Sequence, residues 1–89
     1  GTDILNTEFQ EDASFELWPN PAKDYLNLSG STEYNSICIY SIDGKLVYQS
    51  SENWSGERQI DLNKLSSGMY LLEARSTTNK RLLKKFVKR

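Results

Sequence analysis

The stretch that decides the fold is residues 36–49, SICIYSIDGKLVYQ, in which Asp43 and Gly44 separate two apolar runs. Both runs are rich in β-branched and aromatic residues, which favour strands. Their side chains alternate between two faces, as successive residues of a strand do. Asp and Gly both tolerate the positive φ of a type I′ turn. We therefore predict a β-hairpin formed by residues 36–42 and 45–49.

The same pattern of short apolar runs separated by turn residues continues on both sides of this hairpin. No helical period of useful length is present, and turn signals recur roughly every ten residues. Gly30 and Ser31 are predicted to turn the chain, and Asn79 to take the left-handed position of a last hairpin loop. The seven predicted strands are residues 15–18, 25–29, 36–42, 45–49, 58–62, 69–75 and 82–87. This pattern predicts an all-β fold, a seven-stranded immunoglobulin-like β-sandwich.

Several of the prolines, glycines and aromatic residues are predicted to serve as turn or core residues. The segment Pro19-Asn20-Pro21 must end the first strand, because its prolines fix φ and lack amide donors. Among the aromatic residues, we expect Trp18, Tyr40 and Tyr70 to fill the core, and Trp54, in a polar loop, to be exposed. A mainly structural role is assigned to Pro19, Asn20, Pro21, Asp43, Gly44, Gly68 and Tyr70.

Length and composition exclude several classes of protein. The 89 residues suffice for one domain, and 11 basic against 12 acidic residues argue against a general nucleic-acid binder. Histidine is absent, which excludes a Ser-His-Asp triad and histidine metal ligands. The single cysteine, Cys38, cannot form an internal disulfide or a thiolate zinc cage. No apolar run approaches the ~20 residues of a membrane helix. No catalytic residue, metal or cofactor is predicted.

Three polar features have an ordinary structural interpretation. Cys38 lies mid-strand between apolar neighbours, as buried free cysteines often do. Asp61 lies between Ile60 and Leu62, so its side chain should leave the core. The pair Asp43-Gly44 is far short of a calcium loop, and the hairpin accounts for both residues.

Charge is distributed unevenly along the chain. Residues 80–89 hold six basic residues and no acidic one, whereas residues 1–16 hold five acids and no base. From charge alone, a solvated edge-strand face explains the basic end better than a recognition strip. Residues 1–14 show no sustained period and are predicted to be a flexible linker. They contain no signal peptide, so the protein is either cytoplasmic or an internal or C-terminal piece of a longer one.

Four motifs in order resemble the C-terminal sorting domain of the type IX (Por) secretion system, type A family. Together they cover residues 15–89. Each motif is weak alone, but their order, their spacing and their position at the chain end are specific. The motifs are FELWPNP with DYLNL at residues 15–28, IYSIDGKLV at 39–47, IDL with LSSGMYLL at 60–72, and KKFVKR at 84–89.

The resemblance implies a sorting function rather than an enzyme. Such domains lie at the C-terminus of proteins that bacteria of the Bacteroidetes group export. The exported protein enters the periplasm by means of an N-terminal signal peptide. An outer-membrane translocon then recognises the sorting domain. A sortase usually cleaves before the domain, and the N-terminal passenger is released or joined to lipopolysaccharide at the cell surface. Residues 1–14 are then expected to contain the sortase cleavage region and residues 15–89 to be the sorting domain. Which passenger is carried, which bond is cut and whether the cargo is anchored stay open.

The basic end is the predicted recognition element. We predict that Lys84, Lys85, Val87, Lys88 and Arg89 carry much of the signal, either by docking on an acidic groove or by strand addition. The alternative function is an immunoglobulin-like accessory or carbohydrate-binding module that uses Trp54, and a third is a passive stalk domain. An isolated copy could also form a strand-exchanged dimer.

Overall fold

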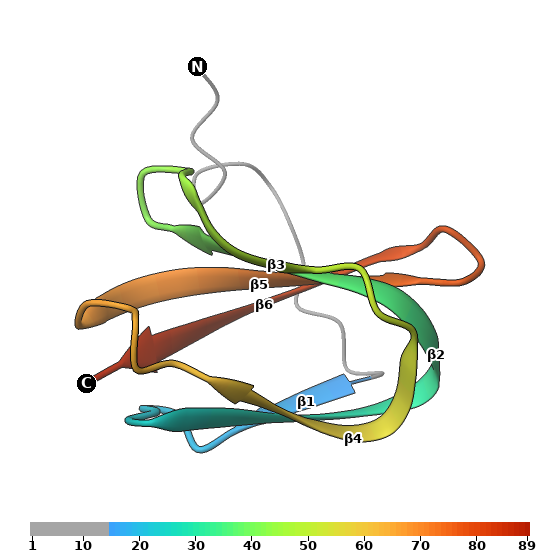
Figure 1. Ribbon diagram of the computed structural model, residues 1–89, viewed down its shortest axis with the longest axis horizontal. Coiled ribbons are helices and arrows are strands. Elements are labelled where there is room, and N and C mark those ends of the chain that lie inside the picture. Colours follow the sequence, from blue (N-terminus) through green and yellow to red (C-terminus); the bar gives the residue numbers. More distant parts are fainter. Residues whose placement is uncertain (1–14) are drawn as a thin grey trace.

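The computed structural model describes residues 15–89 as a curled β-sheet of six strands (Figure 1). The all-β prediction is confirmed, whereas the strand count of seven is wrong. No helix in the described part of the chain is long and apolar enough to cross a membrane. The strands are β1 (Phe15–Trp18), β2 (Tyr25–Ser41), β3 (Leu46–Ser50), β4 (Trp54–Asp61), β5 (Gly68–Ser76) and β6 (Arg81–Lys88).

The long strand β2 joins two layers of the sheet. Its 17 residues curve through the molecule, so that the two halves pair with different neighbours. The first half lies between β1 and β4, and the second half lies between β3 and β5, all in antiparallel pairing. Strand β6 pairs with β5 at the edge of the second layer. The layers β1-β2-β4 and β3-β2-β5-β6 therefore enclose the core between them (Figure 1).

The predicted turn at Gly30 and Ser31 is absent, because both residues lie within β2. Gly30 serves a different purpose. A Cβ atom placed on Gly30 would lie only 2.6 Å from Cζ of Tyr34, whose ring is fully buried. Glycine is thus required here for the space that the Tyr34 ring fills. The two predicted strands on either side merge into one, which reduces the count from seven to six.

The core consists of apolar side chains that both layers direct inward. Period-two alternation explains which side chains enter the core, since buried and more exposed residues alternate along the first half of β2 and along most of β6. In β5 the run from Tyr70 to Ala74 is buried on both faces, which its simple alternation did not predict. The core residues are Phe15, Ala22, Leu26, Leu28, Tyr34, Ile37, Ile39, Ile60, Leu62, Tyr70, Leu72, Ala74, Leu82 and Phe86.

The two tryptophans exchange their predicted roles. Trp18 is 38% exposed, because the alternation of β1 directs Phe15 and Leu17 inward instead. Trp54 begins β4 and packs against the core, with its ring stacked on Tyr34 at 4.3 Å between centroids. The expectation of an exposed Trp54 is therefore wrong, and with it the main argument for a sugar-binding site on this residue.

The central hairpin closes with a three-residue loop rather than the predicted two-residue turn. The N–H of Ser41 donates to the Lys45 carbonyl at 2.8 Å, and the N–H of Gly44 donates to the Ser41 carbonyl at 2.9 Å. Gly44 takes the left-handed position with a φ of 87°. This is the arrangement of a type I turn followed by a bulge. The Ser41 hydroxyl also donates to the Asp43 carboxylate, which holds the pKa of Asp43 below its ordinary value.

The loop between β5 and β6 repeats this arrangement. The N–H of Ser76 donates to the Lys80 carbonyl at 2.9 Å, and the N–H of Asn79 donates to the Ser76 carbonyl at 2.9 Å. Asn79 has a φ of 67°, as predicted. Both loops therefore share the pattern Ser-x-x-(Gly or Asn)-Lys, in which the fourth residue accepts the left-handed conformation.

Candidate functional site

Strand β6, which carries the basic end of the chain, is anchored through its inner face. Leu82 and Phe86 are each only 1% exposed, and the Phe86 ring stacks on Tyr70 with 5.7 Å between centroids. Every residue from Arg81 to Lys88 has a partner on β5. The basic side chains are therefore displayed by a strand that is part of the folded core.

The five predicted recognition residues, which we call the basic strip, do not lie on one face. Lys85 and Val87 are exposed on the outer face of β6, opposite in direction to Phe86. Lys84 points inward at the rim between the layers, with its Nζ 5.9 Å from the centre of the Phe15 ring, a cation–π contact. At the strand end, Lys88 Nζ donates to the Arg89 carbonyl at 2.9 Å. The strip is thus divided between the outer face and the rim.

An apolar group that the sequence analysis missed lies beside the outer part of the strip. Met69 of β5 is paired directly with Val87, and their side chains are 42% and 36% exposed. On the same outer face, a second line of paired residues runs across the sheet from β6 to β3. It consists of Lys85 on β6, Leu71 on β5, Tyr40 on β2 and Leu46 on β3. Leu46 is also exposed. Period-two alternation within the predicted strand 69–75 places Met69 on the face opposite Tyr70 and Leu72, and an apolar side chain on that outer face was the available signal.

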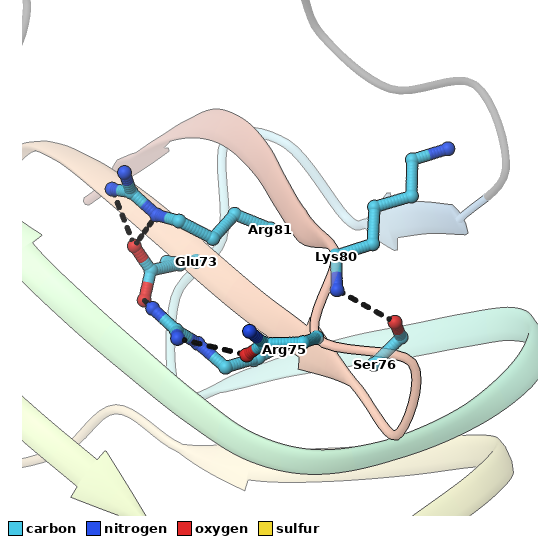
Figure 2. Close-up of polar contacts among 6 residues, drawn as sticks. Glu73, Arg75, Ser76, Lys80 and Arg81 are labelled. Carbon is cyan, nitrogen blue, oxygen red and sulfur yellow. Dashed lines mark hydrogen bonds and ion pairs between the residues drawn. The ribbon is translucent and has the colours of Figure 1, made fainter.

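A buried carboxylate neutralises one base of β6 (Figure 2). Glu73 of β5 is 5% exposed, and both Nε and Nη2 of Arg81 lie 2.7 Å from its Oε2. Nη2 of Arg75 lies 3.9 Å from the other carboxylate oxygen. Burial and the Glu73 charge together raise the pKa of Tyr40. The carboxylate of Glu73 therefore holds the Arg81 side chain within the domain.

Replacing Glu73 with glutamine tests this assignment. The change removes the charge that Arg81 binds, and we expect a loss of about 1–2 kcal/mol in unfolding free energy, limited by the solvent exposure of Arg81. It should also lower the pKa of Tyr40, because a neighbouring negative charge disfavours the phenolate. Urea unfolding and an alkaline titration of tyrosine absorbance measure the two effects. An unchanged tyrosine titration would contradict the proposed electrostatic contact.

The structure places Cys38 and Asp61, the other two polar residues considered in the sequence, on strands of the described part of the chain. Cys38 is half-buried on the outer face of β2. Asp61 is exposed, and its Oδ1 accepts a hydrogen bond from the N–H of Asn63 at 2.8 Å. Within residues 15–89, no group of three or more His, Cys, Asp or Glu side chains is arranged to hold a metal ion.

The Pro19-Asn20-Pro21 turn contacts the end of β6. Oδ1 of Asn20 accepts a hydrogen bond from the N–H of Val87 at 2.9 Å. The N–H of Ala22 donates to the Val87 carbonyl at 2.7 Å, and the Ala22 carbonyl accepts from the N–H of Arg89 at 2.8 Å. The first and the last of the four sequence motifs are therefore joined directly in the fold.

Comparison with known families agrees with this arrangement. Residues 16–89, nearly all of the described part, match the family described as the secretion system C-terminal sorting domain. The chain belongs to this family. The type IX assignment made from the four motifs is confirmed, and so is the function: the domain is a C-terminal type IX sorting signal.

One curated relative shares a segment that is similar to most of this chain. An ulvan lyase from Nonlabens ulvanivorans is 29% identical to this chain over 77 residues. The match covers 85% of this chain but only 14% of the lyase, so the chain spans a small part of that relative. No solved structure matches. The sorting domain is a non-catalytic signal that implies type IX machinery, an N-terminal passenger, and export to the cell surface or extracellular space.

Proposed function

We propose that the type IX machinery recognises the sorting domain at the basic strip together with its apolar neighbour Met69. The observation that carries this proposal is the display of Lys85 and Val87 on the outer face of a strand whose inner face is fixed in the core. A surface of this kind, apolar in the middle and basic at its margin, complements a partner groove with apolar and acidic groups.

We also infer that the domain is an immunoglobulin-like sandwich in which β2 serves both layers. Two features support this. The layers β1-β2-β4 and β3-β2-β5-β6 have antiparallel neighbours, as such sandwiches do. In addition, the Tyr70 hydroxyl donates to the Ser66 carbonyl at 2.6 Å across the connection before β5, which resembles the tyrosine corner of immunoglobulin-like domains. An experimental structure checks the assignment.

The route and the processing of the cargo form part of the proposal. The passenger crosses the periplasm before an outer-membrane translocon binds the domain, and a sortase then cuts within residues 1–14. Those residues lie outside the described part of the chain, so their role as linker stays a prediction. The isolated domain could exchange strands to form a dimer, which size-exclusion chromatography with light scattering tests.

An export assay with point variants tests the recognition surface. Ending the chain at Asn79 is a poor test, because it also removes Leu82 and Phe86 from the core. We therefore fuse residues 1–89 behind a signal peptide and a fluorescent protein, in a host with a type IX system, and compare Lys85→Glu and Arg89→Glu with the parent. Each reversal should lower export at least about fivefold, since like-charge contacts at an interface cost several kcal/mol.

Lys64→Glu provides the matched control. Lys64 is also exposed, but it lies beside Val47 and Tyr48 of β3, at the opposite edge of the layer from β6. Export should be unchanged in this variant. Normal export of both Lys85→Glu and Arg89→Glu, with thermal unfolding equal to the parent, would show that the basic strip is not the recognition element.

A further inference from the structure

The end of β6 is held on both sides. One side pairs with β5, where Val87 faces Met69 and Lys88 faces Gly68. The other side meets residues 20–22, through the three hydrogen bonds that join Asn20 and Ala22 to Val87 and Arg89. This second contact forms a short parallel bridge between Ala22 and Lys88. The hydrogen bond between Asn20 and Val87 connects residues that are 67 positions apart in the sequence.

These hydrogen bonds occupy the backbone groups that an edge strand offers to a partner. Alternate residues of an edge strand direct their N–H and C=O away from the sheet, where another strand can add. At Val87 both groups are already bound, the N–H by Asn20 and the C=O by Ala22. An incoming strand would have to displace residues 20–22 before it could pair there. The side chain of Val87, in contrast, is exposed.

We propose that Asn20 is a positioning residue of the sorting signal. Through residues 20–22 it fixes residues 87–89 in the folded domain, so that the type IX machinery reads their side chains and does not add a strand at this point. This inference rests on the proposed recognition surface. It also decides between the two modes of recognition that the sequence left open, in favour of side-chain docking.

The chemistry assigns this role to Asn20 more than to its neighbours. The two prolines have no N–H to donate, and Ala22 contributes only backbone groups, which substitution of its side chain leaves in place. Asn20 alone in this segment contributes a side-chain acceptor to β6. An aspartate retains that acceptor, because either carboxylate oxygen can accept from an N–H. Alanine removes it.

The experiment compares Asn20→Ala and Asn20→Asp with the parent. Amide hydrogen exchange of the 15N-labelled domain measures the end of β6 directly. In Asn20→Ala we expect the protection of the Val87 and Arg89 amides to fall roughly fivefold, as the loss of one net hydrogen bond predicts, without a comparable change in the core of β5. Export in the fluorescent fusion should fall by a similar factor. Asn20→Asp should retain both protection and export.

Each result has a distinct meaning when Lys85→Glu is measured in parallel. If Asn20→Ala loosens residues 87–89 but is exported normally while Lys85→Glu is not, the positioning role is overturned and the recognition surface stands. Faster export by Asn20→Ala would indicate strand addition and also overturn the proposal. Unchanged amide protection would show that Asn20 does not fix the strand end. If Lys85→Glu and Arg89→Glu are both exported normally, the recognition surface itself has failed.

Discussion

Replacing Gly30 with alanine is expected to cost about 3 kcal/mol of unfolding free energy, although it adds only one methyl group. That methyl would overlap the Tyr34 ring, with Cζ 2.6 Å away. The ring cannot retreat, because it is fully buried and stacked on Trp54. Overpacking of a rigid core typically costs 1–3 kcal/mol and occasionally more, against a total of about 4–11 kcal/mol for a domain of this size.

Urea unfolding of Gly30→Ala measures the effect, and two further variants identify its cause. Ser29→Ala, at the preceding position of β2, should change stability by less than about 0.5 kcal/mol. In a Tyr34→Leu background, which removes the aromatic ring, Gly30→Ala should cost at least about 1 kcal/mol less than in the parent, because contacting sites are not additive. Equal costs in both backgrounds would show that Tyr34 is not the obstacle.

Phe86→Ala is expected to have the largest effect of any single truncation in β6, a loss of about 3–5 kcal/mol. Phe86 is 1% exposed and stacks on Tyr70, so its removal leaves a cavity where β6 meets β5. A loss of this size approaches the whole stability of a small domain. We therefore expect the variant to be largely unfolded at 37 °C and to lose export together with its folded state.

Val87→Ala is the matched control, on the same strand but with an exposed side chain. It should change stability by less than about 0.5 kcal/mol, and any loss of export would then report on recognition alone. Thermal unfolding by circular dichroism separates the two variants. A fully stable Phe86→Ala domain would contradict the assignment of β6 to the core.

Alternation in the sequence was sufficient to predict which residues of most strands face inward. Leu26 with Leu28, and Ile37 with Ile39, lie in the core as their spacing indicates. The error at Gly30 has a physical cause. A glycine that turns the chain and a glycine that makes room for a ring look the same in a sequence, and only the packed Tyr34 tells them apart.

The surface that we propose for recognition could be inferred from the sequence only in part, for a related reason. A run of lysines on a strand is visible in the sequence, but charge alone favoured a solvated edge-strand face, and the chain end became the predicted signal only through the resemblance to the sorting-domain family. The contact between Asn20 and Val87 produces no repeating pattern in the sequence, because a single side chain binds a single backbone group far away in the chain. The exposure of Trp18 and the packing of Trp54 depend likewise on how the two layers meet.

The course of β2 through both layers bears on how the tag can fail. If the two layers shared no strand, one layer could unfold while the other stayed folded, and the machinery would meet a partly folded domain. Here the same 17 residues pair with neighbours in both layers, so unfolding of β2 removes a central strand from both layers at once. We expect a single cooperative folding transition. Apart from local opening at strand ends, the export machinery would then meet a tag whose two layers are either both folded or both unfolded.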